Sequence, residues 1–191
     1  MGDGSPGLLS WTHALSLSSL EIDSLFGRHV NPGLLQILHR LGYDRRRIVS
    51  ASGVHYVDSD GRRILDCWGG FGSLSLGHNH PRLAAVRRAF DESCQVELSH
   101  AFVSGHAAVL ARNLAAIMPG DLEVSYLCCT GSEAVEAALK VAQRCHPDRS
   151  KIVYARNSMH GLTHGALSVT GYERYRAPFK LIPGCVAGMD S

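Results

Sequence analysis

The clearest chemical feature of the sequence is a short turn that contains two hydroxyl side chains and a glycine. Thr130, Gly131 and Ser132 follow an apolar run that ends at Cys129, and a strong helical pattern comes directly after them. Thr130 and Glu133 form a T-x-x-E capping box, which predicts where the helix begins. Exposed N–H groups at a helix N-terminus, joined by two hydroxyls, attract anions. The turn therefore predicts a phosphate site, with a plain capped helix after a strand as the simpler alternative.

Other ligand signatures are incomplete. The P-loop pattern G-x-x-x-x-G-K-[ST] does not occur in the sequence. The glycine-rich loop at 69–72 falls short of the dinucleotide pattern G-x-G-x-x-G, because Ser75 stands where the third glycine is required. Two close histidine pairs, within residues 78–80 and 160–164, have no third ligand at suitable spacing, so we expect no metal site.

The elements that must position the turn alternate between helix and strand. Periodicity and stop signals predict helices at about 81–93, 105–117 and 130–144, and strands at 123–129 and 151–155. This alternation predicts an α/β architecture with a largely parallel sheet. Beyond Gly161 the sequence favours loops.

The N-terminal part follows a different pattern. Residues 1–14 are rich in glycine, serine and proline, and we expect them to be flexible. Helical patterns follow at 16–26 and 32–41. Two short strand patterns around a polar turn predict a hairpin within residues 53–66.

Composition excludes several classes of protein. The 191 residues include 19 Lys+Arg and 17 Asp+Glu, and a net charge of +2 gives no strong attraction to nucleic acid or to an anionic membrane. A hydrophobic content of 45% against 19% charged residues excludes global disorder. No apolar run approaches the ~18 residues of a membrane span, and no secretory signal is recognisable, so we expect a cytoplasmic protein. The six cysteines show no framework spacing, so we expect reduced thiols, with Cys128 and Cys129 buried.

Four short motifs follow one another along the chain. They are G-R-R-I-L-D at 61–66, G-H-N-H-P at 77–81, T-G-S-E-A-V-E-A-A-L-K at 130–140 and H-G-L-T-H-G-A-L-S at 160–168. In this order they resemble the class III pyridoxal-phosphate-dependent aminotransferases, such as the ornithine, acetylornithine, putrescine and 4-aminobutyrate enzymes. The resemblance covers the chain from about Asn31 to its C-terminus.

The resemblance implies fold type I of the pyridoxal-phosphate-dependent transferases, which combines a large α/β domain with a smaller domain built from both chain ends. In these terms residues 15–76 contribute to the small domain, and 77–191 form the first part of the large cofactor-binding domain. The family also implies a homodimer, an amino donor and a 2-oxo acid acceptor. Neither a nucleic acid nor a membrane is an implied partner.

The resemblance also assigns cofactor-binding residues. Thr130, Gly131 and Ser132 match the family segment that holds the phosphate of pyridoxal phosphate, which agrees with the helix-terminus prediction made from the residues alone. His160 and the glycine that follows it match the family's H-G pair beside the cofactor ring. Met159 occupies the place of the usual phenylalanine or tyrosine stacked on the ring, and its thioether makes a softer contact than an aromatic ring.

Two aromatic side chains near the glycine-rich loop have an implied substrate role. Phe71 matches a position where some relatives have an aromatic side chain lining the substrate pocket. Trp68 lies nearby in the sequence, and we weigh the same pocket equally against a place in the core.

The catalytic lysine of the family has no counterpart among the three lysines of the chain. Lys140 follows the phosphate turn at a non-catalytic family position, and neither Lys151 nor Lys180 matches the Schiff-base position. Three interpretations follow. The favoured one is the N-terminal part of a transaminase, inactive by itself. The others are a non-catalytic homologue that acts as a dimerisation or interaction module, and an unrelated α/β phosphate-binding protein.

Overall fold

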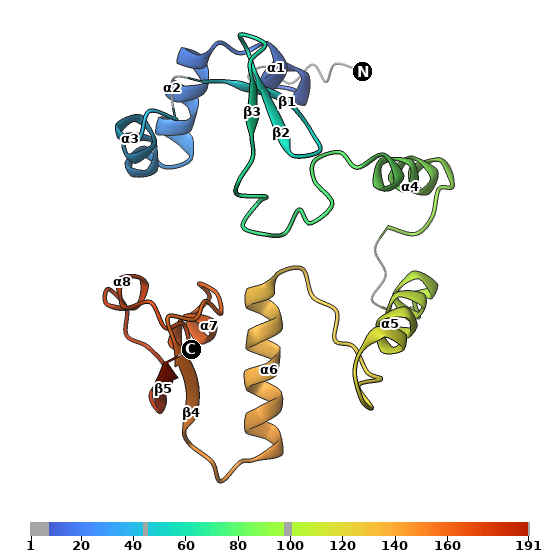
Figure 1. Cartoon of the computed structure of the whole chain (residues 1–191), viewed down its shortest axis with the longest axis vertical. Helices are drawn as coiled ribbons and strands as arrows, with labels where there is room; N and C mark the ends of the chain where they lie inside the picture. Colours follow the sequence, from blue (N-terminus) through green and yellow to red (C-terminus); the bar gives the residue numbers. More distant parts are fainter. Residues whose placement is uncertain (1–7, 44–45, 98–100, 191) are drawn as a thin grey trace. The chain divides into compact units, whose positions relative to one another are not determined.

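The computed structural model of the chain describes residues 8–43, 46–97 and 101–190. The chain divides into two compact units, Met1–Val96 and Glu97–Ser191, whose elements are drawn in Figure 1. Within the described residues, no helix has the length and apolar character of a membrane span. The division into a small-domain segment at 15–76 and a large-domain segment at 77–191 stays a prediction. So does the flexibility of residues 1–14, the first seven of which lie outside the described residues.

The first unit begins with the helices α1 (Trp11–Ser16), α2 (Ser19–His29) and α3 (Pro32–Arg40). The last two confirm the predicted helices, whereas no helix is predicted at α1. Helix α2 begins at a capping box, in which Ser18 and Glu21 each accept a hydrogen bond from the other's backbone N–H. Helix α3 begins at Asn31, whose Oδ1 accepts the N–H of Leu34 at 2.9 Å.

A three-stranded antiparallel sheet follows. Its strands are β1 (Ile48–Ser52), β2 (His55–Asp58) and β3 (Arg63–Leu65), in the order β1-β2-β3. The β2–β3 turn is closed by the buried Asp58, whose Oδ1 accepts the N–H groups of Asp60 and Arg62 at 3.0 and 2.8 Å. The predicted hairpin is thus confirmed, and β1 adds a third strand to it. The predicted helix after the sheet is confirmed as α4 (Pro81–Glu92).

The second unit combines helices with a parallel strand pair. It contains α5 (Gly105–Ile117), α6 (Gly131–Cys145), β4 (Ile152–Arg156), α7 (His164–Ser168), α8 (Glu173–Arg176) and β5 (Cys185–Asp190). β4 and β5 pair in parallel, with Ile152 opposite Cys185. α5, α6 and β4 confirm predicted elements. The prediction of loops beyond Gly161 is wrong at three places, because α7, α8 and β5 are regular elements.

Two further predictions about the second unit are wrong. Residues 123–129 do not form a strand, and Cys128 and Cys129 are exposed. A strand is defined by its hydrogen bonds to a neighbouring strand, and within the described residues this segment pairs with none. An apolar run without a partner strand therefore leaves its side chains accessible. All six cysteines are free thiols.

Among the residues that the structure describes, the longest buried stretch lies at α7. Every residue from 165 to 170 is buried, and Tyr154 of β4 is 7% exposed. Helix α7 packs against α6, which lies beside it in Figure 1. The core of the second unit therefore surrounds the segment that follows the H-G pair.

Candidate cofactor site

The N-terminus of α6 is held by the predicted capping box. Thr130 Oγ1 accepts the N–H of Glu133 at 3.2 Å. The Glu133 carboxylate accepts the N–H groups of Cys129 and Thr130 at 2.8 and 3.0 Å. Glu133 thereby satisfies two backbone donors that directly precede the helix start, which fixes the orientation of the turn at 130–132.

The capping box leaves a defined set of donors at this turn. The N–H groups of Gly131 and Ser132 have no carbonyl partner within the helix, since they belong to its first turn. The hydroxyls of Thr130 and Ser132 act as acceptors, from Glu133 and Leu162 respectively, so each keeps a proton to donate. A Cβ built on Gly131 meets nothing within 4 Å, so the helix end is open. Two N–H groups and two hydroxyls suit a phosphate.

We predict that Thr130→Ala destabilises the second unit by about 1 kcal/mol, because the replaced hydroxyl is the cap acceptor for α6. Thr130→Ser keeps the acceptor and should restore the wild-type free energy of unfolding. Urea denaturation followed by far-UV circular dichroism measures both. Equal stability of the alanine variant and the wild type would show that the cap does not determine the helix start.

The structure brings the two predicted cofactor segments together. The backbone N–H of Leu162 donates to Ser132 Oγ at 3.3 Å. Gly161 has a φ of +135°, and a Cβ built there would lie 2.3 Å from Ser132 Oγ. Only glycine tolerates both the backbone angle and this close approach. The H-G pair and the phosphate turn, which are about thirty residues apart in the sequence, therefore lie in direct contact.

The residues expected beside the cofactor ring lie in the loop after β4. The backbone N–H of His160 donates to Thr170 Oγ1 at 3.1 Å, and that hydroxyl also lies 3.0 Å from the carbonyl oxygens of Gly161 and Ala166. Thr170 is fully buried. Met159 is 53% exposed, so this residue is accessible to a ligand. The loop is thus fixed through its backbone while Met159 remains accessible.

Sequence reasoning assigned no role to two residues that hold this loop, Glu136 and Thr170. Glu136 Oε1 accepts hydrogen bonds from Thr163 Oγ1 and from the N–H groups of Gly165 and Ala166, at 2.7, 2.8 and 3.1 Å. These bonds, the one from Thr163 first among them, lower the pKa of Glu136 below its ordinary value. An acidic residue on α6 four positions after Ser132 was the available signal, since i and i+4 share a helix face.

The aromatic residues of the predicted substrate pocket belong to the first unit. The rings of Trp68 and Phe71 contact one another, with centroids 4.7 Å apart, and both side chains are exposed. This exposure excludes Trp68 from the core of that unit. Phe71 has a φ of +57°, an uncommon conformation for a bulky residue and one that concentrates at functional sites.

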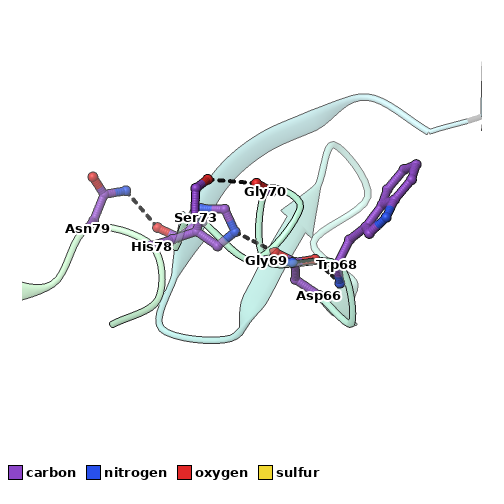
Figure 2. Close-up of polar contacts among 8 residues, drawn as sticks. Asp66, Trp68, Gly69, Gly70, Ser73, His78 and Asn79 are labelled. Atoms are coloured by element: carbon purple, nitrogen blue, oxygen red, sulfur yellow. Dashed lines mark hydrogen bonds and ion pairs between the residues drawn. The ribbon is translucent and has the colours of Figure 1, made fainter. Parts of the chain in front are cut away.

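A buried carboxylate holds the start of this loop (Figure 2). Asp66 Oδ1 accepts the N–H groups of Trp68 and Gly69 at 2.8 and 2.9 Å, and its Oδ2 pairs with His78 Nε2 at 2.8 Å. The Asp66 side chain is only 4% exposed. The bond from Gly69, followed by those from His78 and Trp68, holds the pKa of Asp66 well below its usual range. Asp66 therefore joins both ends of the loop that carries Trp68 and Phe71.

The structure thus forms two local groups. The segments 130–132 and 159–161 lie together in the second unit, and the aromatic pair lies in the first. The roles of these groups in binding a cofactor and a substrate stay predictions. Among the described residues, no group of three histidine, cysteine, aspartate or glutamate side chains is placed to hold a metal ion.

Comparison with known families identifies these motifs. The sequence pattern of the family described as aminotransferase class-III matches residues 42–190. The chain belongs to the class III aminotransferases. Over 171 residues it is 38% identical to an uncharacterized aminotransferase of Archaeoglobus fulgidus, covering 87% of this chain and 38% of the relative.

Solved transaminases share its fold. An (S)-enantioselective ω-transaminase from Thermomicrobium roseum is 29% identical to this chain, with a TM-score of 0.76. The match covers 91% of this chain and 40% of that enzyme. A taurine:2-oxoglutarate aminotransferase from Bifidobacterium kashiwanohense, solved with pyridoxal phosphate and glutamate, is 28% identical with a TM-score of 0.71. The match covers 92% of this chain and 39% of that enzyme. The chain therefore has part of the α/β fold type I of pyridoxal-phosphate-dependent transaminases, and spans about two fifths of the length of these relatives. The predicted family and fold class are confirmed.

Proposed function

We propose that these 191 residues hold the phosphate and one ring face of pyridoxal 5'-phosphate in a transaminase, which moves an amino group from an amino acid or amine to a 2-oxo acid. The observation that carries the proposal is the contact between Ser132 and the loop at 160–162. It places an open helix N-terminus with spare hydroxyl protons directly beside the H-G pair.

Each residue has a distinct part in this proposal. The hydroxyls of Thr130 and Ser132 and the first N–H groups of α6 bind the phosphate oxygens. His160 and Met159 lie against the cofactor ring, and Trp68 and Phe71 line the substrate pocket with aromatic side chains. When bound, the cofactor supplies the aldehyde and the electron-accepting ring that amino transfer requires.

The amine that binds the cofactor aldehyde is, in this proposal, supplied from outside these 191 residues. Lys140, Lys151 and Lys180 are all exposed. Lys140 is nine residues beyond Gly131 on α6, which places it roughly 14 Å along the helix from the phosphate turn. The chain alone is therefore proposed to be inactive. The full enzyme is proposed to be a cytoplasmic homodimer.

Binding of pyridoxal phosphate to the purified chain tests the proposal. We predict reversible binding that inorganic phosphate displaces, without amino transfer. Ser132→Asp should weaken binding by about tenfold or more, because a carboxylate replaces a hydroxyl donor beside the phosphate. Gln143→Glu, which adds the same charge at the far end of α6, should bind like the wild type. Equilibrium dialysis measures these affinities.

Two results would contradict the proposal. One is equal affinity of Ser132→Asp and the wild type. The other is amino transfer by the chain together with a borohydride-stable adduct on a single one of its own lysines.

A further inference from the structure

Glu136 and Ser132 lie four residues apart on the same face of α6, and both side chains contact the segment that follows the H-G pair. Ser132 meets the backbone at Leu162. Glu136 meets Thr163, Gly165 and Ala166. One helix face therefore carries the phosphate turn at its end and a carboxylate anchor one turn further on.

The Glu136 contact has the properties of a specific anchor. A single oxygen, Oε1, accepts three hydrogen bonds of 2.7 to 3.1 Å. Two of the donors are backbone N–H groups in the first turn of α7, which have no partner within their own helix. Thr163 precedes α7 but makes no side-chain cap, and its hydroxyl donates to Glu136 instead. Glu136 therefore takes over the capping of α7 from another helix.

The close approach also depends on glycine. A Cβ built on Gly165 would lie 2.2 Å from Glu136 Oε2 and 2.8 Å from its Oε1. The carboxylate thus rests on the backbone of α7 with no room for a side chain between them. This contact fixes how closely α6 and α7 approach one another at this point.

The position of α7 in turn determines the position of the H-G pair. Thr170 follows α7, and its hydroxyl binds the backbone of His160, Gly161 and Ala166. Residues 165–170 are all buried, so this segment does not adjust independently. A displacement of α7 from Glu136 would therefore displace His160 and Gly161 relative to the phosphate turn.

We propose that Glu136 is a positioning residue, which sets the spacing between the phosphate turn and the His160–Gly161 pair so that both contact one bound pyridoxal phosphate. This proposal rests on the proposed function above. Glu136 does not touch the ligand itself. Glu136 therefore affects the binding of a ligand that spans both segments, such as pyridoxal phosphate. Inorganic phosphate needs only the turn, so its binding does not depend on the spacing that Glu136 sets.

Equilibrium dialysis of pyridoxal phosphate and of inorganic phosphate against the chain tests the proposal. Glu136→Ala should weaken the binding of pyridoxal phosphate by about tenfold and that of inorganic phosphate by less than about threefold. Glu136→Gln keeps an oxygen acceptor and should recover affinity to within about threefold of the wild type. Gln143→Ala, an exposed change on the same helix, is the matched control and should leave both affinities unchanged.

Amide hydrogen exchange supplies a measurement that needs no ligand. In Glu136→Ala the amides of residues 160–166 should exchange faster, while those in the second half of α6 keep their protection. Unchanged exchange at 160–166 would overturn the proposal, and so would an equal loss of affinity for both ligands. If the wild-type chain binds neither ligand, the proposed function fails as well. If the wild type binds both and Glu136→Ala binds them equally well, only the role of Glu136 fails.

Discussion

Gly161→Ala should remove detectable binding of pyridoxal phosphate and destabilise the second unit by about 3 kcal/mol. The new Cβ would lie 2.3 Å from Ser132 Oγ and 3.0 Å from Ala166 Cβ, and the φ of +135° is unfavourable for any residue with a side chain. Relief requires the loop at 160–162 to move away from α6, which separates the two cofactor segments. Dialysis against pyridoxal phosphate and urea denaturation measure the two effects.

A matched glycine provides the control for this prediction. Gly105 begins α5, and a Cβ built there meets nothing within 4 Å, so Gly105→Ala should retain both stability and binding. Combining Gly161→Ala with Ser132→Gly removes the clashing hydroxyl but not the backbone strain, and should recover only part of the stability. A Gly161→Ala chain with wild-type affinity would show that the contact between loop and turn is not needed for the cofactor.

Local signals were sufficient for the part of the site that is built from neighbouring residues. The capping box of Thr130 and Glu133 requires only residues three positions apart, and the structure forms it as predicted. The helices α3 to α6 and the hairpin likewise follow from proline, glycine and periodicity within short windows. That the phosphate turn and the H-G pair serve one cofactor was expected only from the family resemblance, because no local pattern relates segments about thirty residues apart. The contact between Ser132 and Leu162 is shown by the structure alone.

The incorrect predictions have the opposite origin, because they depend on contacts between residues that are distant in the sequence. Residues 123–129 have the composition of a strand, but strand formation depends on a neighbour to pair with. β5 contains a glycine and little alternation, and it is ordered by parallel pairing to β4, more than thirty residues earlier. The anchoring role of Glu136 was missed for the same reason. A glutamate on an amphipathic helix is ordinarily solvated, and only the tertiary structure shows the backbone donors it binds.

The aromatic loop of the first unit should lose its fixed structure when Asp66 becomes asparagine. The carboxylate accepts two backbone N–H groups, pairs with His78 and accepts a hydrogen bond from Tyr56, and an amide keeps only one oxygen for these donors. We expect Trp68 to separate from Phe71 and its fluorescence anisotropy to fall. Trp68 is one of two tryptophans, so Trp11→Phe gives a background in which it is the single reporter.

Acidification of the wild-type chain should reproduce this change. Because hydrogen bonds hold the pKa of Asp66 below its ordinary value, its contribution to stability is complete above about pH 4. That contribution is lost as the pH falls further toward the lowered pKa, where the carboxylate takes up a proton. Tyr56, whose pKa is raised by its hydrogen bond to Asp66, and His78 are the titratable partners of this carboxylate. The Trp68 anisotropy should therefore be constant from pH 7 to about pH 4 and decrease below it.

Comparison with an exposed aspartate separates this effect from general acid unfolding. Asp60 is 63% exposed and pairs with Arg62 at the surface, where an ion pair contributes little to stability. Asp60→Asn should therefore keep the wild-type anisotropy and its acid transition, whereas Asp66→Asn should have a low anisotropy at every pH and no transition. An Asp66→Asn chain that retains the wild-type profile would mean that the backbone of residues 67–77 holds the aromatic pair without the carboxylate. The loop that presents Trp68 and Phe71 would then be fixed by its glycine turns alone, and the ion pair between Asp66 and His78 would have no part in shaping the substrate side of the site.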